Sequence, residues 1–185
     1  RKLPVILEPE EAQNLLKQPN IRYPSSLRNK AIMGIMLFAG LRVSEVVNLR
    51  PGDINLGRNK FRVVCGKGSK DRDLYINDYL SILLSKWRDI RPKSIYFFST
   101  LKGKKLLPRY IQATVKRYSK KSGITKNVSP HTLRHTFATQ FYREKKDIES
   151  LRKILGHEDI STTTIYITLA NIDVEEGMKS FKGFI

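Results

Sequence analysis

The run SSLRNKAIMGIMLFAGL, residues 25–41, constrains the fold more than any other stretch because it is apolar on nearly every side. A helix of that kind has no polar face to turn toward water, so other elements must enclose it. We therefore predict a buried central helix over this run, with a serine as its N-cap and a break at Gly40. The remainder of the chain has to cover this helix on several sides.

The predicted covering elements follow from helix caps, chain breakers and the spacing of apolar residues. Further helices are predicted in EPEEAQNLL, RVSEVVNL, NDYLSILLSKWRDI, LPRYIQATVKRYSKKSG, SPHTLRHTFATQFYREK and DIESLRKILG, with Ser129 and Asp147 as N-caps of the last two. KFRVVC and RDLYI flank the turn GKGSKD, which predicts a β-hairpin with Cys65 buried in it; IYFF is another short strand candidate. The expected fold is mostly α, of the α+β class, with one small antiparallel β-sheet.

The charge balance favours a polyanionic partner. Lys and Arg number 35 against 17 Asp and Glu, which gives a net charge of +18. Nucleic acid is the usual partner of such a surface, and a solvated lysine-rich surface is the plainer alternative. A membrane partner is not expected, because no apolar run approaches the ~18 residues that a spanning helix needs. The first residues lack the apolar core of a signal peptide, so we expect an intracellular, cytoplasmic protein. Together with the charge balance, this favours a protein that handles nucleic acid.

Several polar residues lie where the predicted elements begin, end or turn. An arginine follows Gly40, a lysine lies between two glycines of the hairpin turn, and a histidine follows the helix-ending Gly156. Taken singly, each has a bland explanation, since a lone helical arginine is most often a surface charge and a lone tyrosine is most often packing. The set of candidates is Arg42, Lys67, His131, Arg134, His157 and Tyr166.

The motifs AGLRVSEV, GKGSKDR, HTLRHTFAT and LGHEDISTTTIY, in this order, resemble the signature of the tyrosine recombinase (phage integrase) family, and most of all its Xer-like members. The resemblance extends from about residue 5 to about residue 170. It implies that Arg42 and Arg134 are the arginine pair and Lys67 the hairpin lysine. It also places His131 and His157 at the two histidine positions, Tyr166 at the nucleophile and Glu45 at the acidic position. Many members carry another histidine shortly after the tyrosine, where this chain has Thr168.

By this resemblance, residues 1–185 are a catalytic domain without the family's N-terminal, core-binding domain. The implied activity is site-specific recombination of double-stranded DNA through a 3′-phosphotyrosine intermediate, with no metal, ATP or other cofactor. The implied assembly is a homo-tetramer on two DNA sites when the protein is full length. The tail, residues 170–185, is predicted to form a short amphipathic helix that docks on its own domain or on a neighbouring subunit. A type IB topoisomerase and a catalytically inactive DNA-binding module are the alternative functions.

The residue types suit that chemistry. Two guanidinium groups match the nonbridging oxygens of a phosphodiester, because each offers paired donors that are always charged. A tyrosine hydroxyl needs a base, for which His131 is the candidate, and the leaving 5′ oxygen needs a proton, which Lys67 can supply. His157 can donate to a phosphate oxygen. Lys70 is either a rival to Lys67 or, with Arg72, a contact to the DNA backbone.

His131, His135 and His157 raise the alternative of a zinc site, since histidines four apart on a helix can share a metal. No glutamate lies between the first two as in H-E-x-x-H, and Arg134 on the same face repels a cation. A metal site is therefore not expected. His135 is predicted to point away from the face of Arg134 and to be a buried, hydrogen-bonded histidine rather than a catalytic one.

Overall fold

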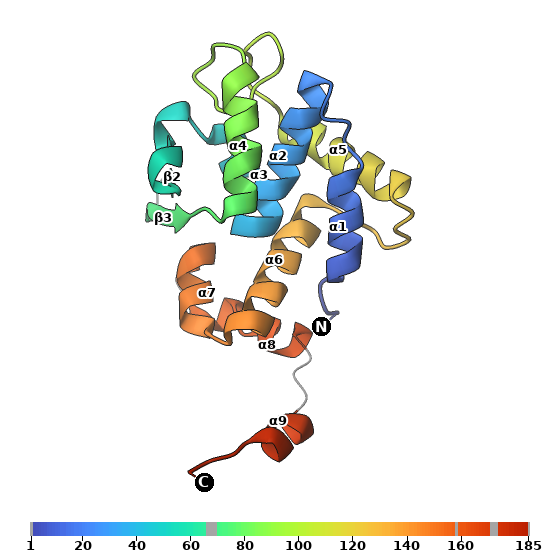
Figure 1. The fold of residues 1–185 in the computed structure, drawn as a ribbon, viewed down its shortest axis with the longest axis vertical. Coiled ribbons are helices and arrows are strands. Elements are labelled where there is room, and N and C mark those ends of the chain that lie inside the picture. Colours follow the sequence, from blue (N-terminus) through green and yellow to red (C-terminus); the bar gives the residue numbers. More distant parts are fainter. Residues whose placement is uncertain (1, 66–69, 158, 171–173, 185) are drawn as a thin grey trace.

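The computed structural model describes residues 2–65, 70–157, 159–170 and 174–184 of the chain. Its helices are α1 (Pro9–Lys17), α2 (Pro24–Ala39), α3 (Val43–Asn48), α4 (Asp78–Ile90), α5 (Pro108–Lys121), α6 (Pro130–Lys145), α7 (Ile148–Leu155), α8 (Ile165–Leu169) and α9 (Val174–Ser180). Its strands are β1 (Ile54–Asn55), β2 (Lys60–Val63) and β3 (Arg72–Tyr75). Figure 1 shows a helical body from which α9 stands apart.

Helix α2 is the central helix, as predicted. Eleven of its 16 residues are buried, and it packs against α1, α4, α5 and α6; Figure 1 shows it between α4 and α1. Gly40 ends the helix with a φ of 71°, a left-handed conformation that glycine adopts without steric cost. The predicted serine N-cap is wrong, because the helix already begins at Pro24 and its N-cap is Tyr23. Proline is favoured at a first helical position, where its missing N–H is not needed.

The small sheet has the order β1-β2-β3 and is antiparallel throughout. Phe61 pairs with Leu74, and both side chains are buried, so this face of the hairpin covers the core. The prediction of the two hairpin strands is confirmed; most of the turn between them, residues 66–69, lies outside the described residues.

Two predictions near the sheet are wrong. Cys65 lies beyond the end of β2 and is only half-buried, because the strand pairing stops at Val63. The run IYFF is not a strand of the sheet. Its two phenylalanines are buried instead as core side chains of an irregular segment, and the Phe97 N–H donates to the Leu49 carbonyl.

Helices α6, α7 and α8 form a second apolar cluster at the C-terminal side of the body, around Ala138, Leu151, Leu155 and Tyr166. The predicted N-caps Ser129 and Asp147 are confirmed, and Gly156 closes α7 with a φ of 72°. The predicted tail helix is present as α9. Across the part of the chain that is described, no helix combines the length and apolarity needed to cross a bilayer.

The end of α2 gives a stability prediction. A Cβ at Gly40 would overlap the ring of Phe137, and its φ is positive. We expect Gly40→Ala to lower the free energy of unfolding by about 2–5 kcal/mol, of which about 1–2 comes from the left-handed backbone and the rest from overpacking. Gly123 has a similar φ of 78° but no atom within 4 Å of an added Cβ, so Gly123→Ala is the matched control and should lose only the backbone contribution. Urea denaturation of both variants tests this; equal losses would contradict it.

Candidate active site

Arg134, on α6, lies at the centre of the site and is only 4% exposed. Its Nη1 donates to the Gly40 carbonyl at 2.7 Å and its Nη2 to the Leu155 carbonyl at 2.8 Å. These carbonyls lie at the C-terminal ends of α2 and α7, where backbone oxygens lack partners within the helix and carry partial negative charge. Arg134 therefore joins three helices, and the two helix ends compensate part of its buried charge.

Glu45, on α3, is one carboxylate among three arginines. Arg72 binds it twice, with Nη1 to Oε2 at 2.6 Å and Nη2 to Oε1 at 3.1 Å. Arg42 and Arg134 each approach it to 3.8 Å. Burial raises the pKa of Glu45, but the hydrogen bonds and charge of Arg72 outweigh that effect and hold the pKa below its ordinary value. Three cations against one anion leave a local excess of positive charge, which suits a phosphate.

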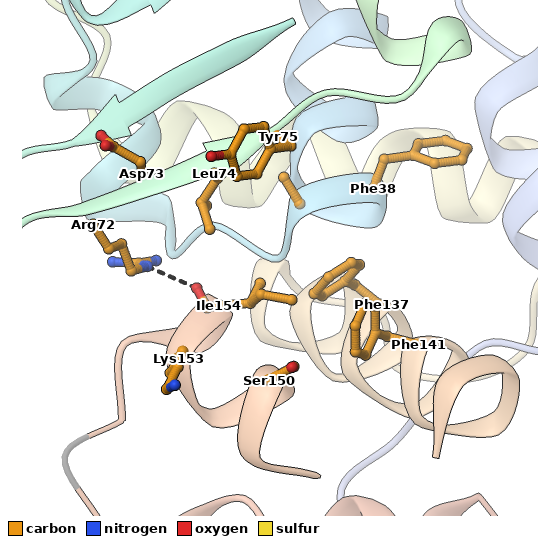
Figure 2. Close-up of a pocket in the computed structure, with 11 residues that line it drawn as sticks. Phe38, Arg72, Asp73, Leu74, Tyr75, Phe137, Phe141, Ser150, Lys153 and Ile154 are labelled. Atoms are coloured by element: carbon orange, nitrogen blue, oxygen red, sulfur yellow. Dashed lines mark hydrogen bonds between the residues drawn. The ribbon is translucent and has the colours of Figure 1, made fainter. Parts of the chain in front are cut away.

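Arg72 lies inside the domain rather than on its surface. Its side chain is 9% exposed, and its Nε donates to the Ile154 carbonyl at 2.7 Å, which links β3 to α7 (Figure 2). Gly156 leaves room for this guanidinium, because a Cβ there would lie 3.1 Å from Arg72 Nη1. The sequence predicts Arg72 as a DNA contact, and that stays a prediction. The observed contacts indicate that Arg72 fixes Glu45 and the end of α7.

The carboxylate of Glu45 gives a pH-dependent prediction. We expect Glu45→Gln to lower the free energy of unfolding at pH 7 by about 3 kcal/mol, because it leaves the buried arginines without their counter-charge. The folded-state pKa of Glu45 is lowered, so its contribution is fully present above the ordinary value of 4.5 and is lost as the pH falls through the folded value.

Urea denaturation at several pH values should therefore show a constant difference from wild type near neutrality that shrinks below about pH 4.5. Glu149→Gln is the matched control, since Glu149 also bonds an arginine, Arg152, but at the surface. A Glu45 variant that differs no more from wild type than this control would contradict the central role of Glu45.

His157 follows α7 and contacts Arg134. Its Nε2 lies 3.2 Å from Arg134 Nη2, and its Nδ1 lies 2.8 Å from the hydroxyl of buried Thr163. Because a guanidinium only donates, Nε2 must accept, and the proton of the neutral ring is then on Nδ1 and donated to Thr163. Burial and then the charges of Arg134, Arg42 and Arg72 lower the pKa of His157 to about 4. The ring is therefore neutral at physiological pH.

Tyr166, on α8, is 2% exposed, and its hydroxyl lies 2.7 Å from Nδ1 of His135. Burial raises the pKa of Tyr166, while the charges of Arg134 and Arg42 oppose that rise. The prediction for His135 is half right: it is partly buried and hydrogen-bonded, but it does not point away from the site. Helix α8 packs on α6, and His135 bonds the candidate nucleophile across that contact.

The other candidates lie as follows. Arg42 precedes α3 with its side chain 41% exposed, and His131 is exposed in the first turn of α6, with its ring centroid 6.3 Å from that of His135. Lys70 is exposed, and Lys67 lies outside the described residues. Within the described ranges, no three His, Cys, Asp or Glu residues come together as metal ligands would.

Sequence reasoning missed the roles of Arg72, Thr163 and His135. The first two carry no local signal, because their partners come from other elements. His135 does carry one. It is four residues after His131, and such residues share one face of a helix.

The described site of this mostly helical domain is a cationic centre in which three arginines surround Glu45, His157 contacts Arg134, and the buried Tyr166 bonds His135. The comparisons with known proteins give the family. The model of the phage integrase family matches residues 6–171, and the chain belongs to that family.

Two curated relatives are named tyrosine recombinases. The tyrosine recombinase XerD of Lacticaseibacillus casei is 38% identical over 176 residues, which is 91% of this chain and 60% of that protein. The tyrosine recombinase of Thermosipho africanus (strain TCF52B) is 35% identical over 179 residues, 97% of this chain and 62% of that protein. The chain thus spans less than two thirds of the length of these relatives.

Solved structures agree with the fold. The XerA recombinase superposes with a TM-score of 0.83 at 31% identity, over 97% of this chain and 64% of that one. The XerH site-specific recombinase in a post-cleavage complex with its difH substrate superposes with a TM-score of 0.82 at 28% identity, over 98% of this chain and 54% of that one. The catalytic domain of bacteriophage HP1 integrase superposes with a TM-score of 0.66 at 26% identity, over 97% of this chain and 95% of that one. The predicted fold, a helical tyrosine recombinase catalytic fold with a small antiparallel sheet, is confirmed.

Proposed function

We propose that this chain is the catalytic domain of a site-specific DNA recombinase, which cuts and rejoins double-stranded DNA through a 3′-phosphotyrosine intermediate. The observation that carries the proposal is the buried Tyr166 under the electrostatic influence of Arg134 and Arg42. These are two of the three arginines whose charge the single carboxylate of Glu45 compensates only in part. Family membership and the recombinase names of the relatives support it.

In this mechanism the scissile phosphate lies against Arg42 and Arg134. Arg134 is fixed by two helix ends and needs little reorganisation, whereas Arg42 is half-exposed and free to close on a nonbridging oxygen. Preorganised donors of this kind stabilise the charge that develops on the phosphate oxygens in the transition state. Glu45 and Arg72 fix the arrangement without touching the phosphate.

The reaction forms a bond between Tyr166 Oη and phosphorus and breaks the bond from phosphorus to the 5′ oxygen. The leaving oxygen takes a proton, for which we propose Lys67, with Lys70 as its rival. His131 faces the phosphate from the first turn of α6. His157 accepts from Arg134 in the free protein; an incoming phosphate favours its protonated form, which then donates to a phosphate oxygen.

We also propose that residues 1–185 form one catalytic domain of a longer recombinase. The near-complete mutual coverage with the HP1 integrase catalytic domain supports this extent, as does the partial coverage of the longer relatives. Such a protein works on DNA inside the cell.

The test uses a pool of DNA duplexes that are randomised around a nick, incubated with the protein in EDTA. After cleavage the short nicked strand diffuses away, so the protein stays covalently attached and its DNA can be recovered under denaturing conditions and sequenced. We expect covalent attachment in EDTA, because Arg42 and Arg134 supply the positive charge that a metal would otherwise provide. We also expect the attached duplexes to share a common sequence. Relaxation of supercoiled plasmid without strand exchange would favour the topoisomerase alternative, and DNA binding without attachment would favour an inactive module.

For assembly, we propose that the tail docks on a neighbouring subunit of a homo-tetramer on two DNA sites. Met178 and Phe181, in and just after α9, are 74% and 75% exposed, and α9 stands apart from the body (Figure 1). A short helix gains little stability in water unless it buries its apolar face. The body has a cavity of about 520 Å³ with Phe38, Tyr75 and Phe137 around it (Figure 2). We propose this cavity as the binding site for the tail of a second copy of the chain.

We expect Met178→Asp combined with Phe181→Asp to leave binding to a single DNA site intact and to prevent assembly of the two-duplex complex. Both side chains are exposed, so the charges should cost the isolated domain little stability. Ile82→Asp is the control, because Ile82 is also exposed but belongs to α4. Sedimentation of full-length protein carrying each variant, with DNA that contains the selected site, measures complex size. Large complexes formed by the double variant would show that the tail does not join subunits.

A further inference from the structure

We propose that His135 is a catalytic residue of this site: its Nδ1 holds the Tyr166 hydroxyl and takes the phenolic proton as the tyrosine attacks the phosphate. This inference rests on the proposed function, and it gives the role of base to a residue that the motif-based assignment leaves out.

The geometry carries the inference. Nδ1 of His135 lies 2.7 Å from the Tyr166 hydroxyl, and the two ring centroids are 5.8 Å apart. A general base must lie within hydrogen-bond reach of the proton that it removes, and this distance fulfils that requirement before DNA arrives. Tyr166 is only 2% exposed, so bulk water is poorly placed to serve instead.

The protonation state also fits. Burial first, and then the charges of His131 and Arg134 on the same helix, lower the pKa of His135 to about 4. The neutral ring has one nitrogen that accepts, and acceptance by Nδ1 from the tyrosine places the ring proton on Nε2. The other ionisable groups around it are Tyr166 on α8 and His157 after α7. At neutral pH, His135 is thus ready to accept.

The same surroundings couple this base to DNA. Without DNA, burial and the positive charge of Arg134 disfavour protonation of His135, so the proton stays on the phenol of Tyr166. A phosphodiester in the site adds a negative charge that stabilises an imidazolium. As the Oη–phosphorus bond forms and the bond to the 5′ oxygen breaks, the phenolic proton moves to His135 Nδ1. It returns to the tyrosine when a 5′ hydroxyl reverses the step.

His131, the base predicted from sequence, is placed differently. It is exposed in the first turn of α6, and its ring centroid lies 6.3 Å from that of His135. The histidine that contacts the tyrosine hydroxyl is His135. This position suits a group that faces the phosphate. In this proposal His135 is the base and His131 faces the phosphate, whereas the sequence prediction makes His131 the base.

The test compares His135→Asn with His131→Asn. The amide of asparagine occupies the place of Nδ1 and keeps a hydrogen bond to Tyr166, but it cannot take a proton. Single-turnover attachment to the nicked duplexes is measured from pH 6 to pH 9. Wild type should show a rate that changes little with pH, because its base is already neutral. His135→Asn should be slower at pH 6 by about 10²–10⁴-fold. Its rate should rise about tenfold per pH unit, as the phenolate fraction does below the tyrosine pKa.

A slower His135 variant with a flat pH profile would mean a merely structural role and would overturn the inference. So would a tenfold rise per pH unit in His131→Asn instead. If His135→Asn fails to fold, His135→Gln also lacks a basic nitrogen and must show the same slope. Wild type that forms no adduct at all would overturn the proposed function itself, which distinguishes the two failures.

Discussion

Arg134→Lys is expected to reduce the rate of covalent attachment to DNA by about 10²–10³-fold, the usual loss when one preorganised donor to a developing oxyanion is removed. The guanidinium of Arg134 donates to two helix ends at once, and in the proposed mechanism it also binds the phosphate. The ammonium of lysine is a point charge that cannot hold the Gly40 and Leu155 carbonyls while also facing a phosphate.

Arg88→Lys is the matched control, because it makes the same exchange at an exposed arginine of α4 that pairs with Asp89. Its attachment rate should stay near that of wild type. Both variants are measured by single-turnover attachment to the nicked duplexes, and their unfolding by urea is measured in parallel. An Arg134 variant with wild-type rate would remove this residue from the chemistry. A rate loss explained by unfolding alone would reduce its role to stability.

The predictable part of the fold is the part that local rules determine. The apolar run at residues 25–41 can only be a central helix, and the helix ends at Gly40 and Gly156 follow from the left-handed conformation that glycine permits. The caps Ser129 and Asp147 are equally local. The strand prediction for the run IYFF is wrong for the complementary reason. Its apolar residues suit a strand and a core segment equally, and only packing decides between them.

The sequence predicts a set of candidate residues but not the network of contacts among them. Motif spacing selects Arg42, Glu45 and Arg134, and in the structure each of the two arginines lies within 4 Å of the Glu45 carboxylate. Spacing cannot show that Arg72 is turned inward, since its partners come from α3 and α7. Nor can it show that His135 meets Tyr166, because that contact depends on how α8 packs on α6.

Tyr166→Phe is expected to abolish covalent attachment to DNA while leaving DNA binding nearly unchanged. The exchange removes one oxygen from a buried ring and alters its packing little. The cost in stability should be about 1–3 kcal/mol, since Nδ1 of His135 loses its partner. Tyr142→Phe is the control, because it makes the same exchange on α6 at a tyrosine that packs against the same apolar cluster. That variant should attach to DNA at the wild-type rate.

The most direct measurement of the central claim is peptide mapping by mass spectrometry of wild-type protein trapped on the nicked duplexes. After digestion with protease and nuclease, the peptide that contains Tyr166 should carry the mass of a nucleotide joined through a 3′ phosphate. In Tyr166→Phe, no peptide should carry it. A nucleotide found on another tyrosine, or an adduct that persists in Tyr166→Phe, would contradict the claim that Tyr166 is the nucleophile of this domain.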